Sequence, residues 1–190
     1  MKEGNTVRFF KENSYYIHRL IITHIGMSVF GLVLLLATNQ ISSVLMLLAS
    51  LFSTLFFGTL VYATLWDKGA KDKAALDAGR IHHGFGHGFF IAFLGEAISM
   101  LLCVLYFICA LCVNIHALFG KIGAVLYTVL MLSDGCFIGT MFYLNPRADN
   151  TALVAPILIA GSLIVSLFGG AGYVLGVREI QLLPRVSHKK

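Results

Sequence analysis

Five long apolar runs constrain this chain more than any other feature of its sequence. A helix needs about 20 mostly apolar residues to cross the roughly 30 Å hydrocarbon core of a bilayer. The composition agrees, because 58% of residues are hydrophobic and only 12% are charged, well away from the balance of soluble domains. We therefore predict an all-α, polytopic membrane bundle of five transmembrane helices, forming one domain over 1–190. The runs cover about 17–37, 41–66, 88–113, 117–144 and 152–177.

The fourth run is less regular than the other four. Ser133, Asp134 and Gly135 interrupt it, yet the run is too short for two crossings and a turn. We expect one tilted or locally broken helix over 117–144, with a re-entrant element or a total of six spans as the alternatives.

Basic residues near short connections set the expected orientation. They gather in the amino-terminal tail and between the second and third runs, at Lys2, Arg8, Lys11, Arg19, Lys68, Lys71, Lys73 and Arg80. We therefore place the amino terminus and the loop 67–87 in the cytoplasm. Five spans would put the basic carboxyl-terminal residues outside, against the same rule, and an even number would remove the conflict. The net charge of +5 then reflects topology and anionic lipid head groups, not nucleic acid binding.

The loop 67–87 has its own charge pattern. Lys68 and Asp72, and likewise Lys73 and Asp77, are four residues apart and could support a short helix on the membrane surface. Charge runs of this kind are usually solvated connectors. The alternative is a docking surface for a transporter or ATPase subunit.

Three ionisable residues inside the spans are the candidate site residues. Glu96, Asp134 and His24 lie roughly 12, 15 and 10 Å from the cytoplasmic ends of their helices, at 1.5 Å per residue. Such residues are expensive in lipid and must face protein or water. We hypothesise that they line a polar cavity that binds a cation, a proton or an amine-bearing solute. The alternative is that each merely hydrogen-bonds a neighbouring helix.

Glycine pairs mark faces where helices can approach closely. Gly135 with Gly139, and Gly172 with Gly176, each form the G-x-x-x-G spacing that lets transmembrane backbones come together. Such faces can pack helices of one chain or bind a second copy, so a homo-oligomer is a possible assembly.

The sequence holds no strong catalytic or cofactor motif. It has no G-x-S-x-G, H-E-x-x-H or P-loop pattern, so an enzyme ranks behind other functions. His83 and His87 have a spacing that suits metals, but interleaved glycines weaken it. Cys109 and Cys112 form a C-x-x-C without a second cysteine pair to relay electrons. We expect neither a bound metal nor a cofactor.

Two segments carry a family resemblance. They are YATLWDKGAKD at 62–72, continuing to DAGR at 77–80, and IGMSVFGL at 25–32. In these the chain resembles an uncharacterised family of small bacterial multi-span membrane proteins. The resemblance implies a bacterial inner membrane and assigns no activity. The glycine-rich end and basic tail are similar only in composition to substrate-binding subunits of vitamin-uptake transporters.

These patterns favour two classes of function. The buried acids and the charged loop indicate a small solute carrier or a membrane subunit of a transport complex. The glycine faces and the absence of motifs favour a non-catalytic assembly or regulatory membrane protein instead.

Overall fold

The computed structural model describes residues 5–79, 85–145 and 151–180, and the regular structure in these ranges is entirely α-helical. This confirms the expected all-α membrane bundle. Four helices are long and apolar enough to cross a bilayer. The bent pair Ala117–Ser133 and Gly135–Leu144 meets the same test when it is counted as one span. The helices are α1 Asn5–Asn39, α2 Ser43–Asp77, α3 Phe85–Cys112, α4 Ala117–Ser133, α5 Gly135–Leu144 and α6 Thr151–Val177.

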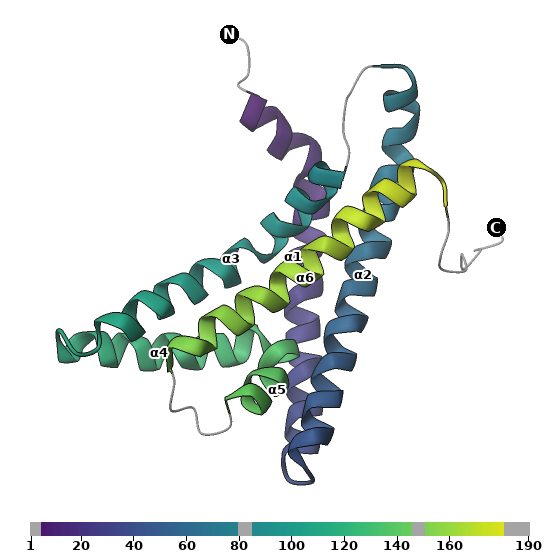
Figure 1. Cartoon of the computed structure of the whole chain (residues 1–190). Coiled ribbons are helices and arrows are strands. Elements are labelled where there is room, and N and C mark those ends of the chain that lie inside the picture. The colour runs from purple at the N-terminus through teal and green to yellow at the C-terminus, as the bar shows by residue number, and fades with distance from the viewer. Residues whose placement is uncertain (1–4, 80–84, 146–150, 181–190) are drawn as a thin grey trace.

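Helices α1 and α2 form a long antiparallel hairpin (Figure 1). The Ser42 side chain starts α2 by accepting a hydrogen bond from the Leu45 amide at 3.1 Å, as N-cap residues do. The helix then continues to Asp77, which corrects the prediction that a loop begins at residue 67. Residues 80–84 of that predicted loop lie outside the described residues.

Ion pairs and close packing explain why 67–77 extend α2. Lys68 contacts Asp72 at 2.7 Å and Lys71 contacts Asp67 at 2.6 Å, both one helical turn apart. Lys73 contacts Glu179 beyond α6 at 2.7 Å, rather than forming the predicted pair with Asp77. The first two pairs support the helix itself and the third joins it to the segment after α6, so 67–77 continue α2 and are not a separate surface stub.

Helix α6 lies alongside α2 and runs in the same direction (Figure 1). Gly172 faces the backbone of Tyr62, and Gly176 faces the backbone of Trp66 four residues later. A side chain at either glycine would collide with α2, so the second G-x-x-x-G pair packs helices of one chain. The first pair does the same, because Gly135 faces Ser28 of α1 and Gly139 faces Met46 of α2. A second copy would have to displace these helices to use either pair.

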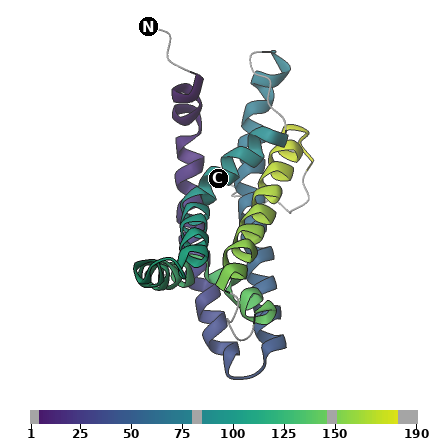
Figure 2. The ribbon, with the colours of Figure 1, turned by 60° about the vertical axis from the view of Figure 1, so that its left-hand side comes forward.

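Helices α4 and α5 are bent by 117° where they meet at Asp134. Helix α4 runs across the direction of α1 and α2 and projects to one side (Figure 2). Both outer ends of the pair lie near the start of α6: Gly120 lines a cavity with Val154, and Leu144 lines another with Pro156. The pair therefore enters and leaves at one end of the bundle, as the re-entrant alternative for 117–144 requires.

This arrangement brings the start of α1 and the ends of α2 and α6 to the same end of the bundle (Figure 1). Tyr16 donates to Asp67 at 3.5 Å, Tyr173 donates to Asp72 at 3.0 Å, and the Trp66 indole donates to the Ile180 carbonyl at 2.8 Å. Arg178 therefore lies at the same end as the lysines of α2, which is where four crossings with a re-entrant 117–144 would place it. The charge conflict that five full spans create disappears.

Fusions at the two ends of the described chain test this topology. We expect a reporter that fluoresces only in the cytoplasm to give the same result before residue 5 and after residue 180, because four crossings return the chain to its starting side. Fluorescence in whole cells is the measurement, and a periplasmic reporter at the same positions is the control. Opposite results at the two ends would mean that 117–144 crosses the bilayer.

Two glycine substitutions test the close helix contacts. Gly139→Ala would place a Cβ 2.6 Å from the Met46 carbonyl oxygen, whereas the same change at Gly26 meets nothing within 4 Å. We expect Gly139→Ala to lower the free energy of unfolding by about 1–3 kcal/mol, the usual range for overpacking. Gly26→Ala, the matched control, should leave it unchanged or raise it slightly. Denaturant unfolding in detergent micelles measures both, and equal effects would contradict the packing.

Candidate functional site

The three ionisable residues singled out in the sequence meet inside the bundle. Nδ1 of His24 on α1 lies 2.8 Å from Oε2 of Glu96 on α3, and its Nε2 lies 3.8 Å from Oδ1 of Asp134. Glu96 is 2% exposed and Asp134 is fully buried. The sequence hypothesis that they face the interior together therefore agrees with the geometry, although His24 stands between the acids. Solute binding by these residues stays a prediction.

The break between α4 and α5 presents backbone groups to this cluster. The Ser133 carbonyl accepts hydrogen bonds from Nε2 of His24, at 2.8 Å, and from the hydroxyl of Ser28. The Ser99 hydroxyl reaches both carboxylate oxygens of Asp134, at 2.6 and 2.7 Å. A bend exposes carbonyl and amide groups that a straight helix would pair internally, and in lipid these groups need partners. The polar side chains of α1 and α3 supply them.

The contacts of His24 define where hydrogens must sit. A carbonyl oxygen only accepts, so Nε2 of His24 carries a hydrogen toward Ser133. Nδ1 and the Glu96 oxygen are at ion-pair distance without the alignment of a hydrogen bond. Two lone pairs that close would repel each other, so one proton lies on either the imidazole or the carboxyl group. The cluster therefore contains a proton with two alternative resting places.

Helix α5 is held in place by polar contacts with the α1–α2 hairpin. The Cys136 carbonyl accepts from Ser50 at 2.6 Å and from Thr54 at 3.4 Å. The Cys136 thiol contacts the Met27 carbonyl at 2.9 Å, and Thr140 donates to Ser50 at 3.1 Å. These bonds fix the start of α5, and through it the position of Asp134.

Little free space adjoins the cluster. A cavity of about 110 Å³ touches it between α1 and α3, and its walls are mostly apolar. This space is too small for most solutes, and its apolar walls offer few groups that could hold water. The lining residues are Ile21, His24, Ile25, Gly95, Ile98, Ser99, Leu102 and Ser133.

Sequence reasoning missed the serines of the site. Ser28 lies four residues after His24 and Ser99 lies three residues after Glu96, so each shares a helix face with its ionisable neighbour. That spacing could have identified both from the sequence. The role of Ser133 could not be found this way, because its carbonyl becomes available only through the bend.

The other histidine and cysteine candidates lie elsewhere. The His87 ring packs against Phe9 and Tyr173, with ring centres 5.4 and 5.2 Å away, and His83 lies outside the described residues. All four cysteines are free thiols. Within 5–79, 85–145 and 151–180, no group of three or more metal-ligating side chains has a geometry that could hold a metal ion.

Comparison of the chain with protein-family models, with curated proteins and with solved structures gives no match. The resemblance to a bacterial membrane family therefore stays a prediction. Function has to be argued from the geometry of this chain alone.

Leucine substitutions test whether the cluster is electrostatically interdependent. His24→Leu should lower the free energy of unfolding by about 3–5 kcal/mol, because it leaves two buried acids without their shared partner. Replacing His24, Glu96 and Asp134 together by leucine should recover most of that loss, since no unpaired charge remains. Denaturant unfolding in micelles measures both, with His18→Leu on the exposed face of α1 as control. A triple variant less stable than His24→Leu would contradict this account.

Proposed function

We propose that this protein is a small membrane carrier, or the membrane subunit of a transport complex, that binds and releases a proton at His24, Glu96 and Asp134. One observation carries the proposal: three ionisable side chains from separate elements meet within the bundle. A hydrophobic core alone has no need of them, and each is expensive to place at membrane depth. Their retention together at a helix break favours a role in moving charge.

The charge balance of the cluster suits a proton. With His24 protonated and both acids ionised, the group carries one net negative charge, and one added proton makes it neutral. The 2.8 Å contact between His24 and Glu96 supplies one place where a proton can pass between side chains. Asp134 supplies a second acceptor 3.8 Å from the other imidazole nitrogen.

A proton fits this site better than a larger solute. Glu96 and Asp134 do not line the adjoining cavity of about 110 Å³. An amine-bearing solute in that cavity would therefore have to displace side chains to reach them. A proton needs no cavity, only a chain of donors and acceptors. Ser99, which binds Asp134 and lines the small cavity, extends that chain to the cavity wall.

Proton binding can be linked to movement through the bend. Asp134 lies between α4 and α5, and Ser99 holds both of its oxygens. Adding a proton turns one of these acceptors into a donor and changes what Ser99 and His24 can bind. Since His24 also holds the Ser133 carbonyl, the charge of the cluster biases the position of the whole re-entrant pair.

Orientation and surroundings follow from charge. We propose that the shared end of α1, α2 and α6 faces the cytoplasm, because Lys68, Lys71 and Lys73 lie there. A bacterial inner membrane is the proposed location, on the family resemblance. Any ATPase or transporter subunit that docks near 67–87 would meet the last turns of α2, which already contact α1 and α6.

A second candidate is a non-catalytic assembly or regulatory protein. The specific observation in its favour is the well-filled interior around the acids, where free space is only about 110 Å³. In that case the cluster would fix the bend of α4 and α5, and would not move protons.

Infrared difference spectroscopy of the protein in lipid nanodiscs tests the proton site directly. We expect a change of pH to produce the carboxyl band of an acid shielded from water, and we expect Glu96→Gln or Asp134→Asn to remove or shift it. Asp77→Asn at the exposed end of α2 is the matched control and should leave the band unchanged. The absence of such a band, or one unaffected by either variant, would contradict proton binding.

Current measurements on a supported membrane separate the two functions. A carrier should give a transient current after a pH step that Asp134→Asn reduces by roughly tenfold or more, as expected when a required proton-transfer group is lost. A titrating infrared band without any current would favour the assembly role.

A further inference from the structure

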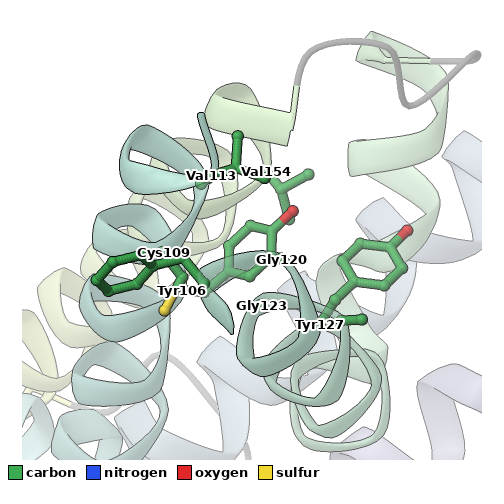
Figure 3. Close-up of a pocket in the computed structure, with 10 residues that line it drawn as sticks. Tyr106, Cys109, Val113, Gly120, Gly123, Tyr127 and Val154 are labelled. Atoms are coloured by element: carbon green, nitrogen blue, oxygen red, sulfur yellow. The ribbon is translucent and has the colours of Figure 1, made fainter. Parts of the chain in front are cut away.

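A second cavity lies between α3 and α4, away from the acidic cluster (Figure 3). Its volume is about 390 Å³, several times that of the space beside His24. Its walls come from the last turns of α3, the first half of α4 and Val154 at the start of α6. Most of the lining is apolar, so water has little reason to fill it.

The polar groups of this cavity are the hydroxyls of Tyr106 and Tyr127 and the thiol of Cys109, and Tyr106 is the tyrosine whose side chain is buried. Tyr106 is only 4% exposed, and its ring extends from α3 into the space between the two helices (Figure 3). The ring stacks at a tilt against Tyr127 of α4, with centres 5.9 Å apart. No hydrogen bond joins its hydroxyl to any residue within 5–79, 85–145 and 151–180. The hydroxyl oxygen is not among the fully enclosed polar atoms, so it is accessible from the cavity, and a molecule bound there can supply an acceptor for it.

Glycines keep the cavity open. Gly120 and Gly123 face it from α4, and a Cβ at these positions would lie 3.5 Å from Val113 and 3.6 Å from Cys109. These are ordinary contact distances, so small side chains would fit without strain. Unlike Gly135 or Gly139, these glycines are not required for a close approach of backbones. Because these two glycines have no side chains, they leave the cavity open, and they do not bring two helix backbones together.

We propose that the α3–α4 cavity binds a membrane-soluble molecule with an apolar chain and one carbonyl oxygen, which accepts a hydrogen bond from Tyr106. The apolar walls take the chain, and the hydroxyl fixes the oxygen-bearing end. Pockets of this size with one or two polar groups are typical small-molecule sites. The site does not depend on the proton function of the acidic cluster, because no residue is shared between them.

Photolabelling in nanodiscs tests the site with two probes matched in length. The first is dodecyl methyl ketone with a diazirine at the end of its chain, and the second is tetradecane with the same diazirine. We expect the ketone to label the lining residues of α3 and α4 in preference to the alkane, by about three- to tenfold, the effect of one hydrogen bond. Unlabelled dodecyl methyl ketone should compete, and unlabelled tetradecane should compete more weakly by the same factor.

Two variants distinguish the contribution of the Tyr106 hydroxyl from that of the cavity volume. Tyr106→Phe should abolish the preference for the ketone while leaving alkane labelling unchanged, and Tyr143→Phe, a tyrosine on α5 outside the cavity, is its control. Gly123→Leu should block both probes, with Gly123→Ala as the control for folding. Equal labelling by ketone and alkane in the unmodified protein would overturn the proposal and leave a space filled by lipid hydrocarbon. Labelling outside these helices would overturn it as well.

Discussion

The contact of His24 with Glu96 and Asp134 is the interaction on which the rest of this structure depends. Burying an ionisable group at membrane depth costs free energy unless the group contacts another polar group or water. They arise from α1, from α3 and from the junction of α4 with α5. Their meeting therefore ties together the three parts of the chain that are not already joined by the contact of α2 with α6. The same contact leaves a proton with more than one resting place.

The bend at Asp134 and the acidic cluster support each other. A sharp bend in lipid is tolerated only where neighbouring groups satisfy the freed backbone, and Ser133 and Cys136 find such partners on α1 and α2. In turn, the bend lets Asp134 project toward His24 while its backbone joins two helices of different direction. An ionisable group is thus joined directly to a helix bend, which is the physical basis of the proposed carrier function.

One set of glycines allows close helix packing, and a different set lies beside an open cavity. Gly135, Gly139, Gly172 and Gly176 bring α5 and α6 against the α1–α2 hairpin, where a side chain would collide with backbone. Gly120 and Gly123 lie instead beside a cavity that contains the unpaired hydroxyl of Tyr106. The first group makes a rigid bundle around the acids. The second leaves α4 with a separate site at the far end from the lysines of α2.

The sequence by itself determined the all-α membrane class, the approximate places of the long helices and the burial of His24, Glu96 and Asp134 among them. These follow from local quantities, namely the length of apolar runs and the distance of a charge from the end of its run. It could also have indicated Ser28 and Ser99, because helical spacing places them beside their ionisable neighbours.

Only the tertiary structure decided how 117–144 folds, which neighbours the glycines face and where His24 lies between the acids. Ser133, Asp134 and Gly135 indicate a break, but the direction of the chain after it depends on partners more than a hundred residues away, such as Ser28 for the Ser133 carbonyl. The continuation of α2 through 67–77 was likewise decided by α1 and α6, whose tyrosines bind the aspartates that the sequence assigned to a loop. Contacts between distant segments carry no local pattern, and that is why these features had to come from the folded chain.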